Sequence, residues 1–273
     1  MFKEIFHNIK TQHPLIHNIT NYVTVNDCAN ILLAAGASPI MSDEEEEVAE
    51  ITAICSALNV NIGTLNKNTI RAMFAAAKKA NELQHPIVLD PVGAGASRLR
   101  TQTALSLLES VSFSVIRGNS SEIKTLAQGS GTTKGVDADS VDTVKGENLD
   151  SAVAFAKTFA AQQKCVVAIT GAIDIVADAK KAFVIYNGDA LMSRITGTGC
   201  QLSALTAAAV AANKGNALEA TAAAVCAMGL AGEIAKKRLS AADGNATYRS
   251  YIIDAIFNMT SEQLEDGAKY EVR

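Results

Sequence analysis

The sequence lacks the paired cysteines that a disulfide framework or a zinc site requires. Its cysteines are an odd number, five in 273 residues, and no two of them form a CxxC pair. This pattern argues against both kinds of cross-link. The cysteines are Cys28, Cys55, Cys165, Cys200 and Cys226. The four histidines are too few, and lie too near the N-terminus, to complete a metal cluster with them.

The sequence also lacks a block of Lys or Arg and an apolar run long enough to cross a bilayer. With a formal net charge of -4, it has no electrostatic attraction to nucleic acid or to an anionic membrane. The longest apolar stretches are interrupted by Asn, Lys or Glu, and residues 1–10 are amphipathic without a signal-type apolar run. We therefore expect a cytoplasmic protein whose partners are small molecules, with no nucleic acid and no membrane.

What the sequence contains is an alternation of short apolar runs with longer segments whose apolar residues recur at helical spacing. The chain is 48% hydrophobic and long enough for one large α/β domain over residues 1–273. The alternation predicts a mostly parallel central sheet with helices on both faces. Strands are expected at residues 38–41, 60–62, 86–90, 114–117, 166–170 and 182–186, and crossover helices at 44–58, 67–83 and 152–162.

Three further segments have distinct patterns. Ser42 is followed by five carboxylates, which predicts a helix with a Ser cap and acidic residues in its first turn rather than a cation site. Residues 128–148 are rich in Gly, Thr, Asp and Lys without periodicity, which predicts a surface excursion. Residues 201–237 are Ala-rich and predict two long packed helices, broken at 213–216.

The sharpest local motif is the turn at residues 195–200, Ile-Thr-Gly-Thr-Gly-Cys, which leads directly into the first of those helices. Gly197 and Gly199 allow the backbone to approach a ligand, and the unpaired amides of a helix start favour an anion such as phosphate. Cys200 then lies at the entrance of this anion site, unless it is simply a small core residue behind a capping turn. The motif is neither a Walker A loop nor the dinucleotide fingerprint.

Polar residues follow three of the predicted strands. Asp90 ends one strand and precedes a glycine-rich turn, and ligands of open α/β sheets bind at that edge. Arg117 ends another and suits phosphate oxygens, while Asn119 and Glu122 behind it offer oxygen ligands of the kind Mg²⁺ takes. Asn119 and Glu122 also have the spacing of a capping box, which is compatible with a metal role. Residues 166–171 supply a hydroxyl and a glycine at the third of these strand ends.

Together these motifs resemble the hydroxyethylthiazole kinase family of ribokinase-like kinases, over nearly the whole chain. The matching stretches are residues 17–23, 36–41, 90–95, 117–122 and 196–200, of which the first and last together are highly specific. The resemblance implies a ribokinase-like three-layer sandwich, ATP as co-substrate with Mg²⁺ as cofactor, and phosphorylation of hydroxyethylthiazole in thiamin biosynthesis. It further implies a homotrimer with active sites at subunit interfaces.

The resemblance also implies roles for individual residues. It implies a substrate pocket lined by Asn21, Val23, Met41 and Gly197, ATP contacts from Arg117, Thr170 and Gly171, a Mg²⁺ region at Asp90 and Glu122, and catalytic roles for Gly197, Thr198, Gly199 and Cys200. Ribokinase-like enzymes generally carry Asp where this chain has Cys200. Two roles are therefore open for the thiol, which either accepts the alcohol proton or only orients the hydroxyl.

Three other functions are compatible with parts of the sequence. The same fold could phosphorylate hydroxymethylpyrimidine or a sugar, although those relatives lack the segment at residues 17–23. Cys200 could instead be a covalent nucleophile for acyl transfer, with His17 as its base. A non-catalytic thiazole- or nucleotide-binding domain is the third alternative. The retention of Asp90, Arg117, Asn119, Glu122 and the glycine turn argues against it.

Overall fold

A nine-stranded sheet runs through the computed structural model, which describes residues 1–129, 144 and 148–273. In spatial order its strands are β2 (Ser38–Met41), β1 (Leu15–Ile19), β3 (Ala57–Asn61), β4 (Ile87–Asp90), β5 (Val115–Asn119), β6 (Val166–Thr170), β7 (Asp174–Ala177), β8 (Ala182–Ile185) and β9 (Tyr270–Val272). Every neighbouring pair from β2 to β6 is parallel. The pairs from β6 to β9 are antiparallel.

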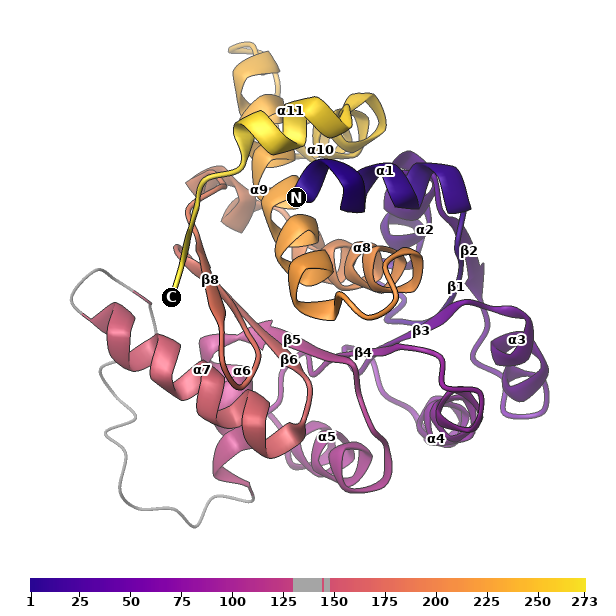
Figure 1. Ribbon diagram of the computed structural model, residues 1–273. Coiled ribbons are helices and arrows are strands. Elements are labelled where there is room, and N and C mark those ends of the chain that lie inside the picture. Colours follow the sequence, from indigo (N-terminus) through magenta and orange to yellow (C-terminus); the bar gives the residue numbers. More distant parts are fainter. Residues whose placement is uncertain (130–143, 145–147) are drawn as a thin grey trace.

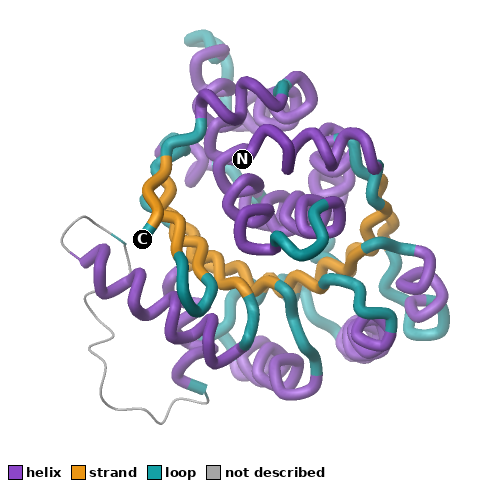
Figure 2. The backbone as a smooth tube through the Cα atoms, in the orientation of Figure 1, coloured by secondary structure: helices purple, strands orange, loops and turns teal. Residues whose placement is uncertain are grey.

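Helices cover both faces of this sheet (Figures 1 and 2). One face carries α3 (Val48–Ile54), α4 (Lys67–Glu82), α5 (Arg98–Ser110), α6 (Ser120–Gln128) and α7 (Leu149–Gln163). The other carries α1 (Phe2–Gln12), α2 (Val25–Ala35), α8 (Thr198–Ala212), α9 (Ala217–Arg238), α10 (Asn245–Asn258) and α11 (Ser261–Gly267). The predicted three-layer α/β architecture is confirmed. A short 3₁₀ helix, Ala190–Arg194, precedes α8.

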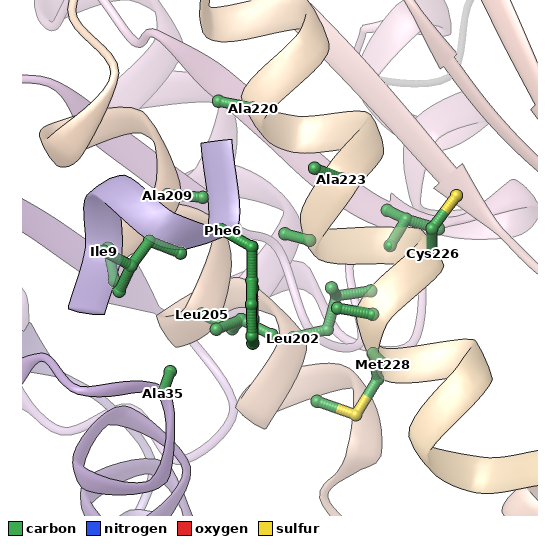
Figure 3. Packing of buried hydrophobic residues seen from close by; sticks show 14 of the residues in the cluster. Phe6, Ile9, Ala35, Leu202, Leu205, Ala209, Ala220, Ala223, Cys226 and Met228 are labelled. Carbon is green, nitrogen blue, oxygen red and sulfur yellow. The ribbon is translucent and has the colours of Figure 1, made fainter. Parts of the chain in front are cut away.

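Helix α8 lies against the middle of the sheet and is buried on every side. All its residues from Gln201 to Ala212 are buried, because α8 packs on β1, β3 and β4 and also against α9 and α2. Helix α9, which is similarly rich in alanine, approaches α8 closely, and Figure 3 shows Ala209 of α8 with Ala220 and Ala223 of α9 in one buried cluster. Small side chains permit that approach, and the burial fixes the direction of α8. The N-terminus of α8 therefore has one defined place at the edge of the sheet.

By length and composition, α9 is the one helix of the described residues that could cross a membrane. However, 78% of its most apolar window is buried inside the fold. The apolar character of α9 is thus accounted for by its place in the core between α8 and α10.

Most predicted elements occur where the sequence placed them. Strands β2 and β6 match the predicted bounds, and α4 and α7 match within three residues. The pair of Ala-rich helices is also confirmed, with the break at residues 213–216 between α8 and α9. The predicted surface excursion, residues 128–148, lies almost entirely outside the described residues.

Two predictions at the start of the sheet were wrong. The helix expected over residues 44–58 is only α3, because residues from Ala57 onward form β3, which is buried on both faces. Ser42 does not cap that helix: its hydroxyl donates to Glu47, and its carbonyl bonds to a ring nitrogen of His17. Three strands, β1, β7 and β9, were not predicted. The last of these pairs with β8 from the far end of the chain.

Candidate active site

The polar strand ends meet along one edge of the sheet. In parallel strands the carboxyl ends point the same way, so residues that end neighbouring strands lie side by side. Asn61 is in register with Asp90 on β3 and β4, and Asn119 with Thr170 on β5 and β6. The N-terminus of α8 reaches the same edge, since Ser203 in its second turn bonds to Asp90. The sheet thus brings together motifs that are more than a hundred residues apart in sequence.

The glycine turn begins α8, one turn earlier than the sequence pattern predicted. Gly197 is the N-cap residue with φ of 93°, a left-handed conformation that favours glycine. No side chain of the described residues caps this helix, which leaves its first amides available to an anion. A Cβ atom on Gly197 would lie 2.8 Å from Cγ2 of Thr24, so the turn is also closely packed.

Arg117 connects the strand ends to the glycine turn. Its Nη2 donates to the Thr170 hydroxyl at 2.6 Å, and its Nη1 lies 3.5 Å from Oδ2 of Asp90. Its Nε is buried without a hydrogen-bond partner among the described residues. The guanidinium thus keeps N–H groups that could donate to a phosphate oxygen.

Asp90 is a fully buried carboxylate with one free oxygen. Its Oδ2 accepts hydrogen bonds from Asn61 and Ser203, both at 2.8 Å. Its Oδ1 has no partner within the described part of the chain. Burial raises the pKa of Asp90 to about 6; the positive charge of Arg117 opposes this rise, and the negative charge of Glu122 adds to it. An orphaned carboxylate oxygen beside a second acid fits a site for a cation.

Glu122 has a structural task as well. Its Oε2 accepts the backbone N–H of Asn119, whose side chain accepts the N–H of Glu122, so the predicted capping box is confirmed at the start of α6. Its Oε1 accepts the N–H of Gly93 in the turn after β4. Glu122 thereby holds the two turns together, and its carboxylate is less free than that of Asp90.

Cys200 lies in a cradle of two amide groups. Its Sγ accepts hydrogen bonds from Nδ2 of Asn21 at 3.2 Å and from Nδ2 of Asn61 at 3.3 Å. Burial and the negative charge of Asp90 raise the pKa of the Cys200 thiol, whereas the hydrogen bonds of its polar neighbours lower it. The net direction is upward, which favours the protonated thiol at neutral pH.

Asn21 uses its whole side-chain amide inside this cradle. Besides Cys200, its Nδ2 donates to Oδ1 of Asn61 at 3.0 Å. Its Oδ1 accepts both the backbone N–H and the hydroxyl of Thr24 at 3.1 Å. Direct hydrogen bonding of the Asn21 side chain to a substrate would require it to leave one of these partners.

His17 is not arranged to activate Cys200. Its Nδ1 bonds to the Thr52 hydroxyl and its Nε2 to the carbonyl of Ser42, both at 2.9 Å. The ring is fully buried, and burial lowers the pKa of His17. With both ring nitrogens occupied elsewhere, His17 cannot be the base that the acyl-transfer alternative requires.

Two cavities adjoin this network. The larger, of about 600 Å³, is lined by the predicted ATP contacts Arg117, Thr170 and Gly171 and by Thr198 and Gly199 of the turn. The smaller, of about 150 Å³, is lined by Met41 and by Thr20 and Tyr22 on either side of Asn21. Val23 stands apart, because its side chain is 58% exposed and lines neither cavity.

Two residues at this edge were missed by reasoning on the sequence. Asn61 ends β3, and an Asn between the apolar residues of the strand predicted at 60–62 was the signal that could have revealed it. Asp174 begins β7 and lines the larger cavity, where its Oδ1 accepts the N–H of Gly171 at 2.8 Å. Burial raises the pKa of Asp174 to about 7. Its strand was not predicted, so nothing pointed to its position.

The three-layer fold and its sheet define an α/β protein of the ribokinase-like fold class. A ribokinase-like superfamily protein from Enterococcus faecalis superposes with a TM-score of 0.63 over 93% of both chains, at 14% identity, which speaks for the fold alone. The family model named "Hydroxyethylthiazole kinase family" matches residues 6–262. The chain belongs to that family.

Individual relatives agree with this assignment. A hydroxyethylthiazole kinase of Clostridium acetobutylicum is 62% identical over 99% of both chains. One of Clostridium beijerinckii is 49% identical over 96% of this chain and 93% of its own. The solved structure of a hydroxyethylthiazole kinase from Pyrococcus horikoshii superposes with a TM-score of 0.88 at 37% identity, and covers 100% of this chain and 98% of the other. Both the family resemblance and the ribokinase-like fold inferred from the sequence are confirmed.

Proposed function

We propose that this chain transfers the γ-phosphoryl group of ATP to the primary alcohol of 4-methyl-5-(2-hydroxyethyl)thiazole, as a step of thiamin biosynthesis or salvage. The names of its relatives supply the acceptor, since they are hydroxyethylthiazole kinases of nearly the same length. The chemistry forms a bond between the alcohol oxygen and the γ-phosphorus and breaks the bond between that phosphorus and the β–γ bridging oxygen. ADP leaves with the electron pair, and the alcohol proton passes to the thiolate form of Cys200 or to solvent.

One observation carries the proposal: the start of α8 lines the larger cavity and is hydrogen-bonded to the loop that lines the smaller one. Thr198 and Gly199 line the larger cavity, while the next residue, Cys200, is held by Asn21 from the loop that lines the smaller one. The larger cavity falls in the size range of ligand pockets. We assign the nucleotide to the larger cavity and the thiazole to the smaller one beside Met41. The γ-phosphoryl group then passes from the nucleotide to the alcohol beside the start of α8.

The chain's own contribution is positioning and charge. Phosphoryl transfer requires an aligned acceptor and neutralised phosphate oxygens more than a strong base. The first amides of α8, at residues 198–200, are assigned to the transferred phosphoryl group, and Arg117 to the nucleotide phosphates, with Thr170 and Gly171 beside it. Burial favours the protonated form of Cys200, so we assign the thiol to orienting the hydroxyl of the acceptor alcohol. The smaller thiolate fraction can accept the alcohol proton.

The acidic residues fit a Mg²⁺ ion that enters with the nucleotide. Asp90 offers a buried carboxylate oxygen without a partner among the described residues, with Glu122 near enough to raise its pKa. The described residues hold no group of three His, Cys, Asp or Glu side chains that could form a complete metal site. Mg²⁺ typically keeps several waters and binds through one or two carboxylates plus phosphate oxygens. Asp90 and Glu122 would hold such an ion, which supplies charge neutralisation on the phosphates.

We further propose that the chain is a single-domain cytoplasmic enzyme that works as a homotrimer. One sheet runs through the described residues, which supports a single unit. Tyr22 and Val23 are 78% and 58% exposed, next to Asn21 of the cradle. A subunit interface there would cover these apolar side chains and explain how Val23 could reach a substrate pocket. Multi-angle light scattering should give a mass of three chains of 28.5 kDa each, and the mass of one chain would contradict the assembly.

The function is tested by ADP release with candidate acceptors. 4-Methyl-5-(2-hydroxyethyl)thiazole should give rapid ATP- and Mg²⁺-dependent ADP formation, with hydroxymethylpyrimidine and ribose as competing acceptors. The phosphorylated thiazole should appear in equal amount by mass spectrometry. Faster turnover of the pyrimidine or the sugar would refute the substrate and leave the kinase. An acylated Cys200 without ADP formation would refute the kinase.

A further inference from the structure

Asn61 lies at the centre of the polar network and links its two functional ends. On one side its Nδ2 donates to Oδ2 of Asp90 at 2.8 Å. On the other side the same Nδ2 donates to Sγ of Cys200 at 3.3 Å. An amide nitrogen carries two hydrogens, so one can serve each partner.

The remaining oxygen of this amide is also fully used. Oδ1 of Asn61 accepts the backbone N–H of Gly63 at 2.9 Å and Nδ2 of Asn21 at 3.0 Å. Turning the amide over would set its oxygen against the Asp90 carboxylate and its NH₂ group against the Gly63 N–H. Both contacts would be repulsive, so the neighbours fix the orientation of Asn61.

We propose that Asn61 is a positioning residue for phosphoryl transfer, which rests on the function proposed above. Its NH₂ group binds both the Asp90 carboxylate, on the nucleotide and metal side, and the Cys200 thiol, on the alcohol side. It thereby keeps these two groups at a set distance from each other. Neither partner touches the other through a hydrogen bond of its own; Asn61 is the bridge between them. The side chain is 1% exposed, and nothing but an amide of this length supplies two donors and two acceptors at the end of β3.

Other residue types at position 61 would break this arrangement in predictable ways. Asp has the same shape but would set a carboxylate against Asp90 and present no donor to Cys200. Ala would leave a cavity and remove all four hydrogen bonds. In either case both Asp90 and Cys200 become free to shift, and small displacements of reacting groups are costly in rate.

The test is steady-state kinetics of Asn61→Ala, with ADP formation from hydroxyethylthiazole as the signal. Hydrogen bonds to charged groups typically contribute about 1.5–3 kcal/mol, so kcat should fall by roughly 10- to 100-fold. KM for ATP and for the thiazole should change far less than kcat. Asn61→Ser fills more of the space than Ala without adding a buried charge and serves if the Ala variant is poorly folded; its short side chain cannot reach both Asp90 and Cys200, so a loss of kcat is expected there too.

Asn59→Ala is the matched control. Asn59 lies two residues earlier on the same strand, is fully buried, and donates to Oδ1 of Asn18 at 3.1 Å instead of to Asp90 or Cys200. Its removal should lower the melting temperature less than Asn61→Ala does, because it also creates a cavity at a buried amide but removes one hydrogen bond instead of four. Its kcat should stay near that of the parent.

A second measurement separates positioning from general support of the fold. In a Cys200→Ala background one of the two links is already gone. The fold-loss of kcat caused by Asn61→Ala should therefore be smaller there than in the parent, by a factor of about 3 or more, as for other coupled neighbours. An equal loss in both backgrounds, or a parent-like kcat in folded Asn61→Ala, would overturn the role of Asn61 and leave the proposed function standing. A parent that forms no ADP with any tested alcohol would instead refute the proposed function, and this role with it.

Discussion

A Cβ atom on Gly199 would lie 2.5 Å from Nη1 and 2.7 Å from Nη2 of Arg117. The guanidinium therefore rests on the backbone of the α8 start, between the glycine turn and Asp90. Both residues line the larger cavity. The turn thus does two things. It presents backbone amides to an anion, and it leaves room for the Arg117 guanidinium that would bind the same anion.

Gly199→Ala should weaken ATP binding more than it weakens the fold. The new methyl group would push the flexible end of Arg117 away from Thr170 and Asp90, and loss of a charge-assisted contact should raise KM for ATP by roughly 10-fold or more. Ala is favoured over Gly within a helix by up to about 1 kcal/mol, which offsets part of the cost of moving Arg117 away from the buried Asp90, so the melting temperature should fall less than in Gly197→Ala. Titration of ATP in the ADP-release assay checks the first, and differential scanning fluorimetry checks the second.

Gly197→Ala is the comparison for that variant. Its φ of 93° is strained for any residue with a Cβ, and the added atom would lie 2.8 Å from Thr24. We expect lower stability together with lower activity. If Gly199→Ala instead behaved like Gly197→Ala, with a large loss of stability, the close contact with Arg117 would be a packing contact only.

Asp90→Asn should reduce kcat/KM for ATP strongly at limiting Mg²⁺ and less so at high Mg²⁺. The substitution keeps the shape of the side chain and removes the charge proposed to hold the ion. Initial rates across a Mg²⁺ series check this. Glu122→Gln should show a smaller effect on Mg²⁺ dependence but some loss of stability, because Glu122 also forms the capping box of α6. Full activity of Asp90→Asn at limiting Mg²⁺ would exclude the metal role.

Activity should fall on the acid side as pH drops through about 6, the raised pKa of Asp90. Above that pH the carboxylate is charged and can attract Arg117 and a cation, whereas below it the protonated form cannot. The pH dependence of kcat/KM reports groups of the free enzyme, so it is the quantity to measure between pH 5 and pH 8. Asp90→Asn is the control and should lack this acid limb. An unchanged limb in that variant would assign it to another group.

Substitutions at Cys200 should rank Asp above Ser and Ala. Asp is a competent proton acceptor of similar reach, and the two amides that donate to Sγ would also donate to a carboxylate oxygen. Cys200→Asp should therefore keep substantial activity and can exceed the parent. Loss of a general base typically costs about 10²–10⁴-fold, so a much smaller loss in Cys200→Ala would mean that positioning dominates.

The measurement for this series is initial ADP formation with hydroxyethylthiazole, with folding checked by circular dichroism. A folded Cys200→Asp variant without activity, together with a covalent adduct on the parent Cys200, would contradict the kinase mechanism. His17 already argues against such an adduct, since both of its ring nitrogens are bonded elsewhere.

Local features of the structure could be predicted from the sequence because neighbouring residues determine them. The capping box of Asn119 and Glu122 depends on spacing within one turn. The break between α8 and α9 follows from Asn213 and the glycine that comes after it. The motif at residues 195–200 indicated a helix start next to an anion site, and the structure shows an uncapped helix start there.

Elements that depend on distant partners were harder to predict. Ala57 and Leu58 were predicted as the end of a helix, and belong to β3 because β1 and β4 pair with this strand on both sides. Strand β9 has three residues and pairs with β8, while Tyr270 packs its ring against Phe2 and Phe183 from distant parts of the chain. No local pattern in these segments specifies such partners.

The sequence by itself determined the α/β class, the glycine turn, the separate polar strand ends and, through resemblance, the kinase family. Only the tertiary structure decided how these pieces act on one another. Asn21, Asn61 and Cys200 are up to 179 residues apart in the chain, yet their side chains are in hydrogen-bond contact. Parallel pairing sets the strand ends side by side, and the burial of α8 sets Cys200 over them. Hydrogen bonds of this kind depend on distance in space, which a sequence does not contain.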